Sequence, residues 1–192
     1  VGKYLSDYQH NARHRLPSGL AFFGWLNLFS LRHSKGTLMG YQLIETIEVG
    51  SGGVANVTFS NIPQDGIDLI CLVSGRSNNG GVFRTCAFLY NGITTSTYRN
   101  NLLSSDGSSV YASNNLYTYW GVQANGSTST ANTFSNIELR ISNYTASAAK
   151  SASIDGVFEN NATNAYIELL ALSETGTDPV TSLLVGLDNF VE

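Results

Sequence analysis

The side chains that most often perform catalysis are few in this chain and lie far apart. All three histidines, His10, His14 and His33, fall near the beginning, so the long remainder has no imidazole. That remainder cannot build a Ser-His-Asp or Cys-His arrangement. No serine lies in a Gly-x-Ser-x-Gly turn, and neither a His-Glu-x-x-His nor a Cys-x-x-Cys spacing occurs. His10 and His14 could bind a metal on a helix, but basic neighbours favour a solvated patch. We expect no catalytic centre, no metal and no cofactor.

Carboxylates are more frequent, and a pair of carboxylates is the device that glycosidases use. Four lie in strand-like stretches of the second half: Glu138, Asp155, Glu159 and Glu168. Side chains alternate along a strand, which places Glu138 and Glu168 on solvent faces, so surface acids are the simpler interpretation. Asp65 and Asp68 could supply half of a calcium site. The full acidic loop spacing is missing, and a turn before a strand explains them equally well.

Two cysteines stand in apolar surroundings, Cys71 in LICLV and Cys86 in TCAFL. If residues 67–75 and 82–90 form a hairpin that turns at Asn78 and Asn79, the two thiols face each other across the strands. A turn centred one residue later would displace them by two positions. Buried free cysteines behave as small hydrophobic residues, so we expect reduced core positions. A disulfide is the alternative if the protein matures in an oxidising compartment.

Four aromatic residues cluster within ten positions: Tyr111, Tyr117, Tyr119 and Trp120. Tyr117 and Tyr119 are expected to share one face of a strand, with Trp120 on the other. Such a face could bind a glycan, although core packing or a subunit interface explains the cluster about as well.

The charged residues divide the chain into a basic part and an acidic part. Residues 1–40 hold five basic residues and one acid, a net charge of +4, whereas residues 41–192 carry a net charge of −8. Asn, Ser and Thr number 19, 23 and 16, and only 12% of residues are charged, so the polar surface is mostly uncharged. We therefore expect a basic, partly apolar N-terminal arm over residues 1–40 and an acidic β domain over residues 41–192. The basic residues are a weak signal for nucleic acid, which is not an expected partner.

The apolar part of the arm runs from Leu20 to Leu31 and reads LAFFGWLNLFSL. It is too short to span a bilayer and lacks the polar face of a surface-lying helix, so no membrane partner is expected. It could pack on its own domain, but its aromatic side chains would form an adhesive patch in water, which favours packing on another subunit. A signal peptide is a third interpretation, weakened by basic residues where the cleavage site should stand. The candidate contact residues are Arg13, Arg15, Phe22, Phe23, Trp25, Phe29, Arg32 and Lys35.

The rest of the chain alternates short apolar stretches with turns built from Gly, Asn and Ser. We expect strands over residues 41–49, 54–59, 67–75, 82–90, 98–103, 116–124, 131–142, 151–158, 164–173 and 181–187. In the first strand, Tyr41, Leu43, Ile47 and Val49 are expected on one face, with Glu45 a break in the pattern. No segment beyond residue 40 is a convincing helix. This pattern predicts an all-β fold, an antiparallel β-sandwich of jelly-roll type with an N-terminal arm.

Several short motifs occur in a fixed order through residues 40–192. They are YQLIETIEVGSGG (41–53), VTFSNIP (57–63), TANTFSN (130–136), ISNY (141–144), KS (150–151) and FENNAT (158–163). In these motifs the chain resembles small β-rich virion proteins of tailed bacteriophages. The resemblance implies a capsid decoration (cement) protein or a tail-fibre component, often trimeric and not an enzyme. Such proteins begin near the position of Met39, so the resemblance carries nothing onto residues 1–38.

On this basis we expect a structural virion protein, a decoration or cement subunit that binds and stabilises the capsid through its N-terminal arm. Its partners would be the major capsid protein and further copies of itself, as a homotrimer on the capsid surface of a virion made in the host cytoplasm. Aromatic side chains of the arm would bury apolar area, worth about 25 cal/mol per Å². Basic residues would steer docking onto acids of the capsid. The alternative is a receptor- or glycan-binding module of a tail fibre that uses Tyr117 and Tyr119.

Overall fold

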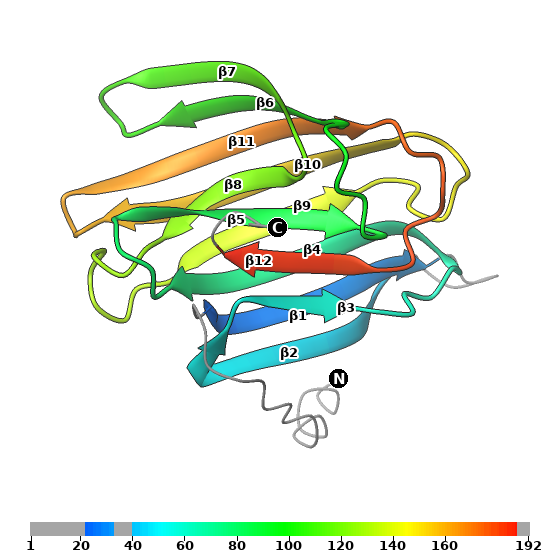
Figure 1. The fold of residues 1–192 in the computed structure, drawn as a ribbon, viewed down its shortest axis with the longest axis horizontal. Helices are drawn as coiled ribbons and strands as arrows, with labels where there is room; N and C mark the ends of the chain where they lie inside the picture. Colours follow the sequence, from blue (N-terminus) through cyan, green and yellow to red (C-terminus); the bar gives the residue numbers. More distant parts are fainter. Residues whose placement is uncertain (1–21, 33–39, 188–192) are drawn as a thin grey trace.

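The computed structural model describes residues 22–32 and 40–187, and every regular element within them is a β-strand (Figure 1). Five of the six non-glycine residues with positive φ are asparagines, which tolerate the left-handed conformation that turns between strands require. The strands are β1 (Phe22–Arg32), β2 (Gly40–Val54), β3 (Asn56–Phe59), β4 (Gly66–Ser77), β5 (Phe83–Tyr90), β6 (Tyr98–Ser105), β7 (Val110–Tyr117), β8 (Trp120–Asn125), β9 (Ser135–Ile141), β10 (Lys150–Asn160), β11 (Asn164–Glu174) and β12 (Leu183–Leu187).

The strands belong to one hydrogen-bonded sheet that divides into two groups. The long group has the order β2–β1–β4–β9–β10–β11–β6–β7, with every neighbouring pair antiparallel. The short group has the order β3–β12–β5–β8 and is also antiparallel. One parallel residue pair, Arg76 with Asn125, joins β4 to β8. The sheet is therefore open and mixed. The all-β class is confirmed, whereas the sandwich and its jelly-roll connectivity stay predictions.

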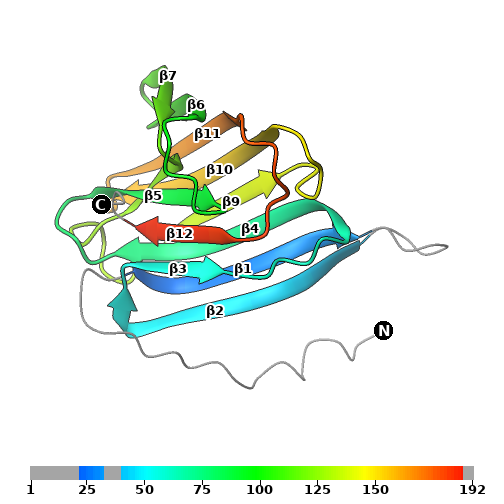
Figure 2. The same ribbon diagram turned by 45° about the vertical axis from the view of Figure 1, so that its right-hand side comes forward.

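The apolar core lies between the two groups (Figure 2). Leu26, Leu28 and Leu139 from the long group and Phe88 and Val185 from the short group are almost completely buried in it. Aromatic rings cross from one group to the other: the Trp120 ring lies 5.5 Å from that of Tyr90 and 5.4 Å from that of Tyr98. The Trp120 indole N–H donates to the carbonyl oxygen of Ser173 at 3.3 Å, so its polar atom is satisfied inside the core.

Strand β1 is part of the sheet, which corrects the boundary that charge predicted at residue 40. Residues 22–32 pair with β4 on one side and with β2 on the other. Gly24 has a φ of +140°, and a side chain there would collide with the carbonyl oxygen of Ser74. The prediction failed because a strand that is apolar at both odd and even positions shows no period of two. Residues 1–21 and 33–39 of the expected arm lie outside the described residues.

Strand β2 does not keep one face throughout its length. Its register with β1 shifts between Leu28 and Phe29, where Glu45 lies opposite Leu28 and Leu43 opposite Phe29. Such a β-bulge inserts one residue and reverses the faces beyond it. Leu43 is therefore exposed, whereas Ile47 packs on the core. The expected single apolar face was wrong, and the break at Glu45 marks the bulge.

The predicted hairpin of residues 67–75 and 82–90 does not form. Strand β4 pairs with β1 and β9, whereas β5 pairs with β12 and β8, so the turn between them crosses from the long group to the short one. The expected strand over residues 116–124 is also divided, because β7 ends at Tyr117 and β8 begins at Trp120. Both errors arise because adjacency along the chain does not fix which strands pair.

Candidate functional site

The long group has a face that points away from the short group, here called the outer face. It carries most of the exposed large apolar side chains of the described residues: Trp25, Tyr41, Leu43, Leu103, Val110, Leu116, Val157, Ile167 and Leu169. The solvent-facing side of an antiparallel sheet is ordinarily polar. An exposed apolar surface spread over neighbouring strands is typical of a protein-binding surface.

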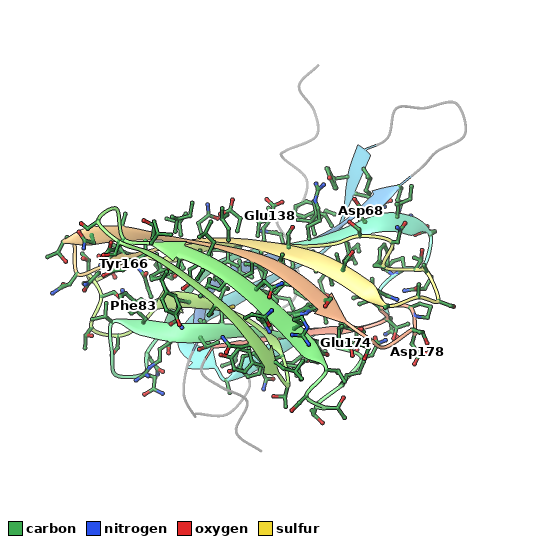
Figure 3. The ribbon with its side chains drawn as sticks, turned by 90° about the horizontal axis from the view of Figure 1, so that it is seen from above. Asp68, Phe83, Glu138, Tyr166, Glu174 and Asp178 are labelled. Carbon is green, nitrogen blue, oxygen red and sulfur yellow. The ribbon has the colours of Figure 1, made fainter. Side chains whose placement is uncertain are left out.

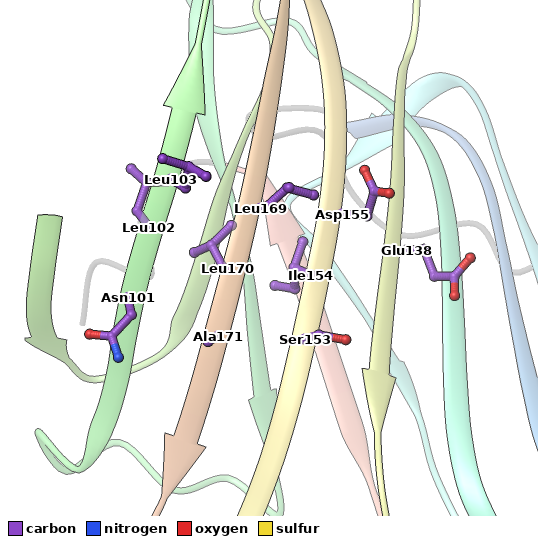
Figure 4. A pocket seen from close by; sticks show the side chains of 10 residues that line it. All are labelled: Asn101, Leu102, Leu103, Glu138, Ser153, Ile154, Asp155, Leu169, Leu170 and Ala171. Carbon is purple, nitrogen blue, oxygen red and sulfur yellow. The ribbon is translucent and has the colours of Figure 1, made fainter. Parts of the chain in front are cut away.

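The apolar side chains of β10, β11 and β6 form one patch on the outer face. Val157 lies opposite Ile167, and Leu169 lies opposite Leu103, so the four occupy adjacent positions on three strands. Each is between 42% and 48% exposed. A shallow hollow of about 490 Å³ is lined by Leu103 and Leu169 from this patch and extends to Glu138 on β9 (Figure 4). We call these four residues the apolar patch.

Two carboxylates border the apolar patch. Glu138 of β9 lies directly opposite Asp155 of β10, both are exposed, and both line the hollow. Like charges in directly opposed positions destabilise a sheet. Neither carboxylate has an ion-pair partner among the described residues. They stand on an open surface, which suits recognition of a cationic partner better than enclosure of a scissile bond.

The other two candidate glycosidase acids lie elsewhere and have structural contacts. Glu168 of β11 is only 6% exposed and accepts a hydrogen bond from the Gln123 N–H at 2.8 Å. Burial raises the pKa of Glu168, and this hydrogen bond lowers it in part. Since Glu168 faces the core, the expectation that it lies on a solvent face was wrong. It cannot form an acid pair with Glu138 or Asp155, which are on the opposite face.

Glu159 fastens the loop between β8 and β9. Its carboxylate accepts hydrogen bonds from the Thr130 N–H and hydroxyl, from the Thr133 hydroxyl and from the Ala162 N–H, at 2.6 to 2.8 Å. Burial raises the pKa of Glu159, but the hydrogen bonds from Ala162, Thr133 and Thr130 together lower it below its ordinary value. From the opposite side, the Arg76 guanidinium donates to carbonyl oxygens of the same loop, among them those of Ser127 and Thr130. No spacing in the sequence predicts these contacts, because most of the residues that make them are far apart along the chain.

Asp65 and Asp68, which could have supplied half of a calcium site, each lie beside an arginine. Asp65 pairs with Arg32 at 2.7 Å, and Asp68 lies 4.0 Å from Arg140. In Figure 3, Asp68 and Glu138 lie on the upper side of the molecule, and Glu174 lies on the lower side. Among residues 22–32 and 40–187, no three His, Cys, Asp or Glu side chains gather as a metal site would require.

The contact residues predicted for the arm are divided by the structure. Trp25 is 51% exposed on the outer face, Phe29 is half-buried on that face, and Arg32 is held by Asp65. The backbones of Phe22 and Phe23 lie in β1, but their side chains fall outside the description. The other predicted contact residues, Arg13, Arg15 and Lys35, lie outside the described residues. Residues 24–32 therefore present one row of side chains to the core and one to the outer face.

Cys71 and Cys86 are both free and buried. Burial raises the pKa of each thiol, and the neighbouring Cys71 raises that of Cys86 further. A thiol held in its neutral form is a poor nucleophile. This agrees with the predicted reduced core positions, although the hairpin that was to bring the two together is absent.

The rings of Tyr117 and Tyr119 stack, with centroids 5.7 Å apart and an interplanar angle of 7°, although Tyr119 lies in the turn after β7 and not on one strand with Tyr117. Trp120 turns into the core, where it is fully buried. Tyr117 is 41% exposed, and Tyr111 on the same strand is 62% exposed. Sequence reasoning missed β7 as a strand, because its side chains are exposed on both faces and show no alternation.

No family model matches the chain, and comparisons with curated proteins and with solved structures find no match either. Within the described ranges there is no helix with the length and apolar character needed to cross a membrane.

Proposed function

We propose that the chain is a structural virion protein, a capsid decoration or cement subunit that binds the major capsid protein through its outer face. The observation that carries this proposal is the gathering of exposed apolar side chains on one face of a rigid sheet. The motifs in residues 40–192 that resemble phage virion proteins add to it. We also propose that the two strand groups are the layers of a jelly-roll-like β-sandwich, because they enclose one common core.

The proposed contact surface revises the expected attachment through an arm. Trp25 and Phe29 reach the outer face from β1, on the same sheet as the apolar patch. Covering the exposed portion of each apolar patch residue contributes roughly 1 kcal/mol before ordering costs. Glu138 and Asp155 stand beside the patch and favour basic residues on the partner. Arg13, Arg15 and Lys35, outside the described residues, are proposed to steer docking onto capsid acids.

A density map of the purified phage particle tests this proposal. A cement protein occupies the capsid lattice in hundreds of copies, with the outer face against the major capsid protein. A map that places the chain in a few copies at the tail would contradict the proposal and support a fibre module.

A pair of matched substitutions tests the surface. Ile167 lies on the outer face and is 43% exposed. Ile67 at the start of β4 is 37% exposed, and it alternates along the strand in step with Leu69 and Cys71, which do not face outward. We expect Ile167→Asp to weaken binding to capsids at least about tenfold, because it buries an unpaired charge in the contact. Ile67→Asp should leave binding unchanged. Equal binding by both variants would exclude the outer face.

The tail-fibre alternative is favoured by one observation, the parallel Tyr117–Tyr119 stack. The exposed ring of Tyr117 suits stacking against the apolar face of a sugar. A glycan array distinguishes the two functions: binding that Tyr117→Ala removes and Ile167→Asp preserves would favour the receptor-binding module.

A further inference from the structure

Three described strands have a neighbour on one side only, and they differ in how that open edge is protected. They are β2, β3 and β7. Strand β3 has only four residues. Strand β2 carries Glu45 and Glu48, and its register shifts twice. Short length, charges and bulges are the devices by which proteins prevent one sheet edge from pairing with another.

Strand β7 has none of these devices. It is eight residues long, reads VYASNNLY, and contains no charged residue, proline or glycine. Its register with β6 is continuous from Val110 to Tyr117. Val110 and Leu116 are 74% and 50% exposed on the outer face, and Tyr111 and Tyr117 are exposed on the other. An uncharged, regular edge with apolar side chains on both faces is a template for a further strand.

We propose that β7 pairs antiparallel with β7 of a second copy of this chain, so that the long group continues across a two-fold axis. An identical copy is the favoured occupant because charged side chains on an edge strand repel those of a second copy, whereas β7 has none of its own. The guanidinium of Arg99 on β6 donates to Asn114 Oδ1 at 3.0 Å. The strand is also self-complementary about its centre. A two-fold at Ser113 places Val110 opposite Leu116 of the partner subunit, and a two-fold at Asn114 places Tyr111 opposite Tyr117 of the partner subunit.

This assembly extends the outer face. Leu116 lies opposite Arg99 on β6, and Val110 lies opposite Ser105, so the apolar side chains of β7 adjoin the strands that hold the apolar patch. Pairing β7 with its copy makes the outer faces of two chains one continuous surface. The inference does not depend on the capsid, since it concerns the purified chain alone.

Light scattering after size-exclusion chromatography tests the proposal on the full chain. We expect twice the chain mass of 20.7 kDa. Ala112 is exposed on β7 opposite Leu103, and Ala112→Lys places a charge on each edge. That variant should raise the dimer dissociation constant at least about tenfold. Gln42→Lys on the β2 edge is the matched control and should leave the dimer intact. A monomer, or the homotrimer that the resemblance implies, would overturn the proposal.

Cysteine cross-linking tests the register without depending on a weakened fold. The native thiols are buried, so a cysteine introduced at the surface reports its own neighbours. Asn114→Cys or Ser113→Cys, whichever lies on the axis, should give a disulfide-linked dimer under mild oxidation, because directly opposed residues lie within disulfide reach. Gln42→Cys should stay monomeric under denaturing conditions. Failure of both β7 cysteines to cross-link, or equal cross-linking by Gln42→Cys, would exclude the β7 interface.

Discussion

The two faces of the long group are built from similar residues and have different surroundings. On β1 the inward side chains Leu26 and Leu28 are completely buried, whereas Trp25 between Gly24 and Leu26 is 51% exposed. On β11, Leu170 and Leu172 are buried and Leu169 is 43% exposed. Apolar character therefore does not by itself decide burial. The inner face is covered by the short group, whereas the outer face has no such cover among the described residues.

The carboxylates show the same contrast. Glu168 on the inner face is buried with a backbone N–H as partner, and burial raises its pKa. Glu138 and Asp155 on the outer face stand opposite one another in water. A charge on the inner face is costly because burial removes it from water. On the outer face the cost is the repulsion between the two carboxylates, which water and salt screen.

The strongest way to test this comparison is within β1. Leu26→Ala should lower the free energy of unfolding by about 2–5 kcal/mol, because it removes fully buried volume from the core. Trp25→Ser on the outer face should lower it clearly less, because half of the Trp25 side chain is already exposed. Denaturant unfolding of both variants measures the difference. Comparable losses for the two would show that the outer face of β1 is covered within the single chain.

Alternation of buried and exposed side chains allowed some strands to be predicted, and its absence hid two others. Residues 151–158 and 164–173 were expected as strands and form β10 and β11, because buried and exposed side chains alternate along both. Strand β1 was hidden by apolar residues at nearly every position, and β7 by side chains exposed on both faces. A difference between the two faces is thus a strong signal for a strand, although β5 was predicted from its apolar run without one.

The candidate site was less predictable than the fold. The apolar patch joins Leu103 of β6 to residues of β10 and β11 more than fifty positions later in the chain, and it depends on a register that only the folded sheet defines. Trp25 was identified as a contact residue from its type, but the strand that holds it was expected in an arm. A register shift of one residue would have reversed every face, and no local pattern fixes it.

We expect an intermediate effect on the free energy of unfolding at Glu168, and this effect depends on pH. The folded pKa is raised above the unfolded one, so the stability that this group contributes is fully present below the unfolded pKa. It is lost as pH rises through the folded pKa. Glu168→Gln keeps an oxygen for the Gln123 N–H and carries no charge. It should therefore increase the free energy of unfolding at neutral pH and flatten its decline above about pH 4.

Denaturant midpoints measured across this pH range check the expectation. Glu138→Gln on the outer face is the matched control, and its profile should keep the decline seen in the unaltered protein. If Glu168→Gln instead loses stability at neutral pH, the carboxylate makes a favourable charged contact in the core.

The smallest effect is expected where the two carboxylates oppose each other on the outer face. Neutralising either one, as Glu138→Gln or Asp155→Asn, should raise the free energy of unfolding by a few tenths of a kcal/mol, roughly 0.2–0.5. The double variant should gain little more, because the first change already removes the repulsion. The gain should vanish in about 1 M salt, where screening acts within ~3 Å.

Urea unfolding of the two single variants and the double variant, in low and high salt, measures this repulsion. Capsid binding by the same variants tests whether a partner uses the two carboxylates. A small gain in stability together with weaker binding would show that the outer face retains a repulsive pair because a partner neutralises it. Lower stability on neutralisation would mean that the pair already has its cations within the chain, and the contrast with the inner face would then rest on the apolar patch alone.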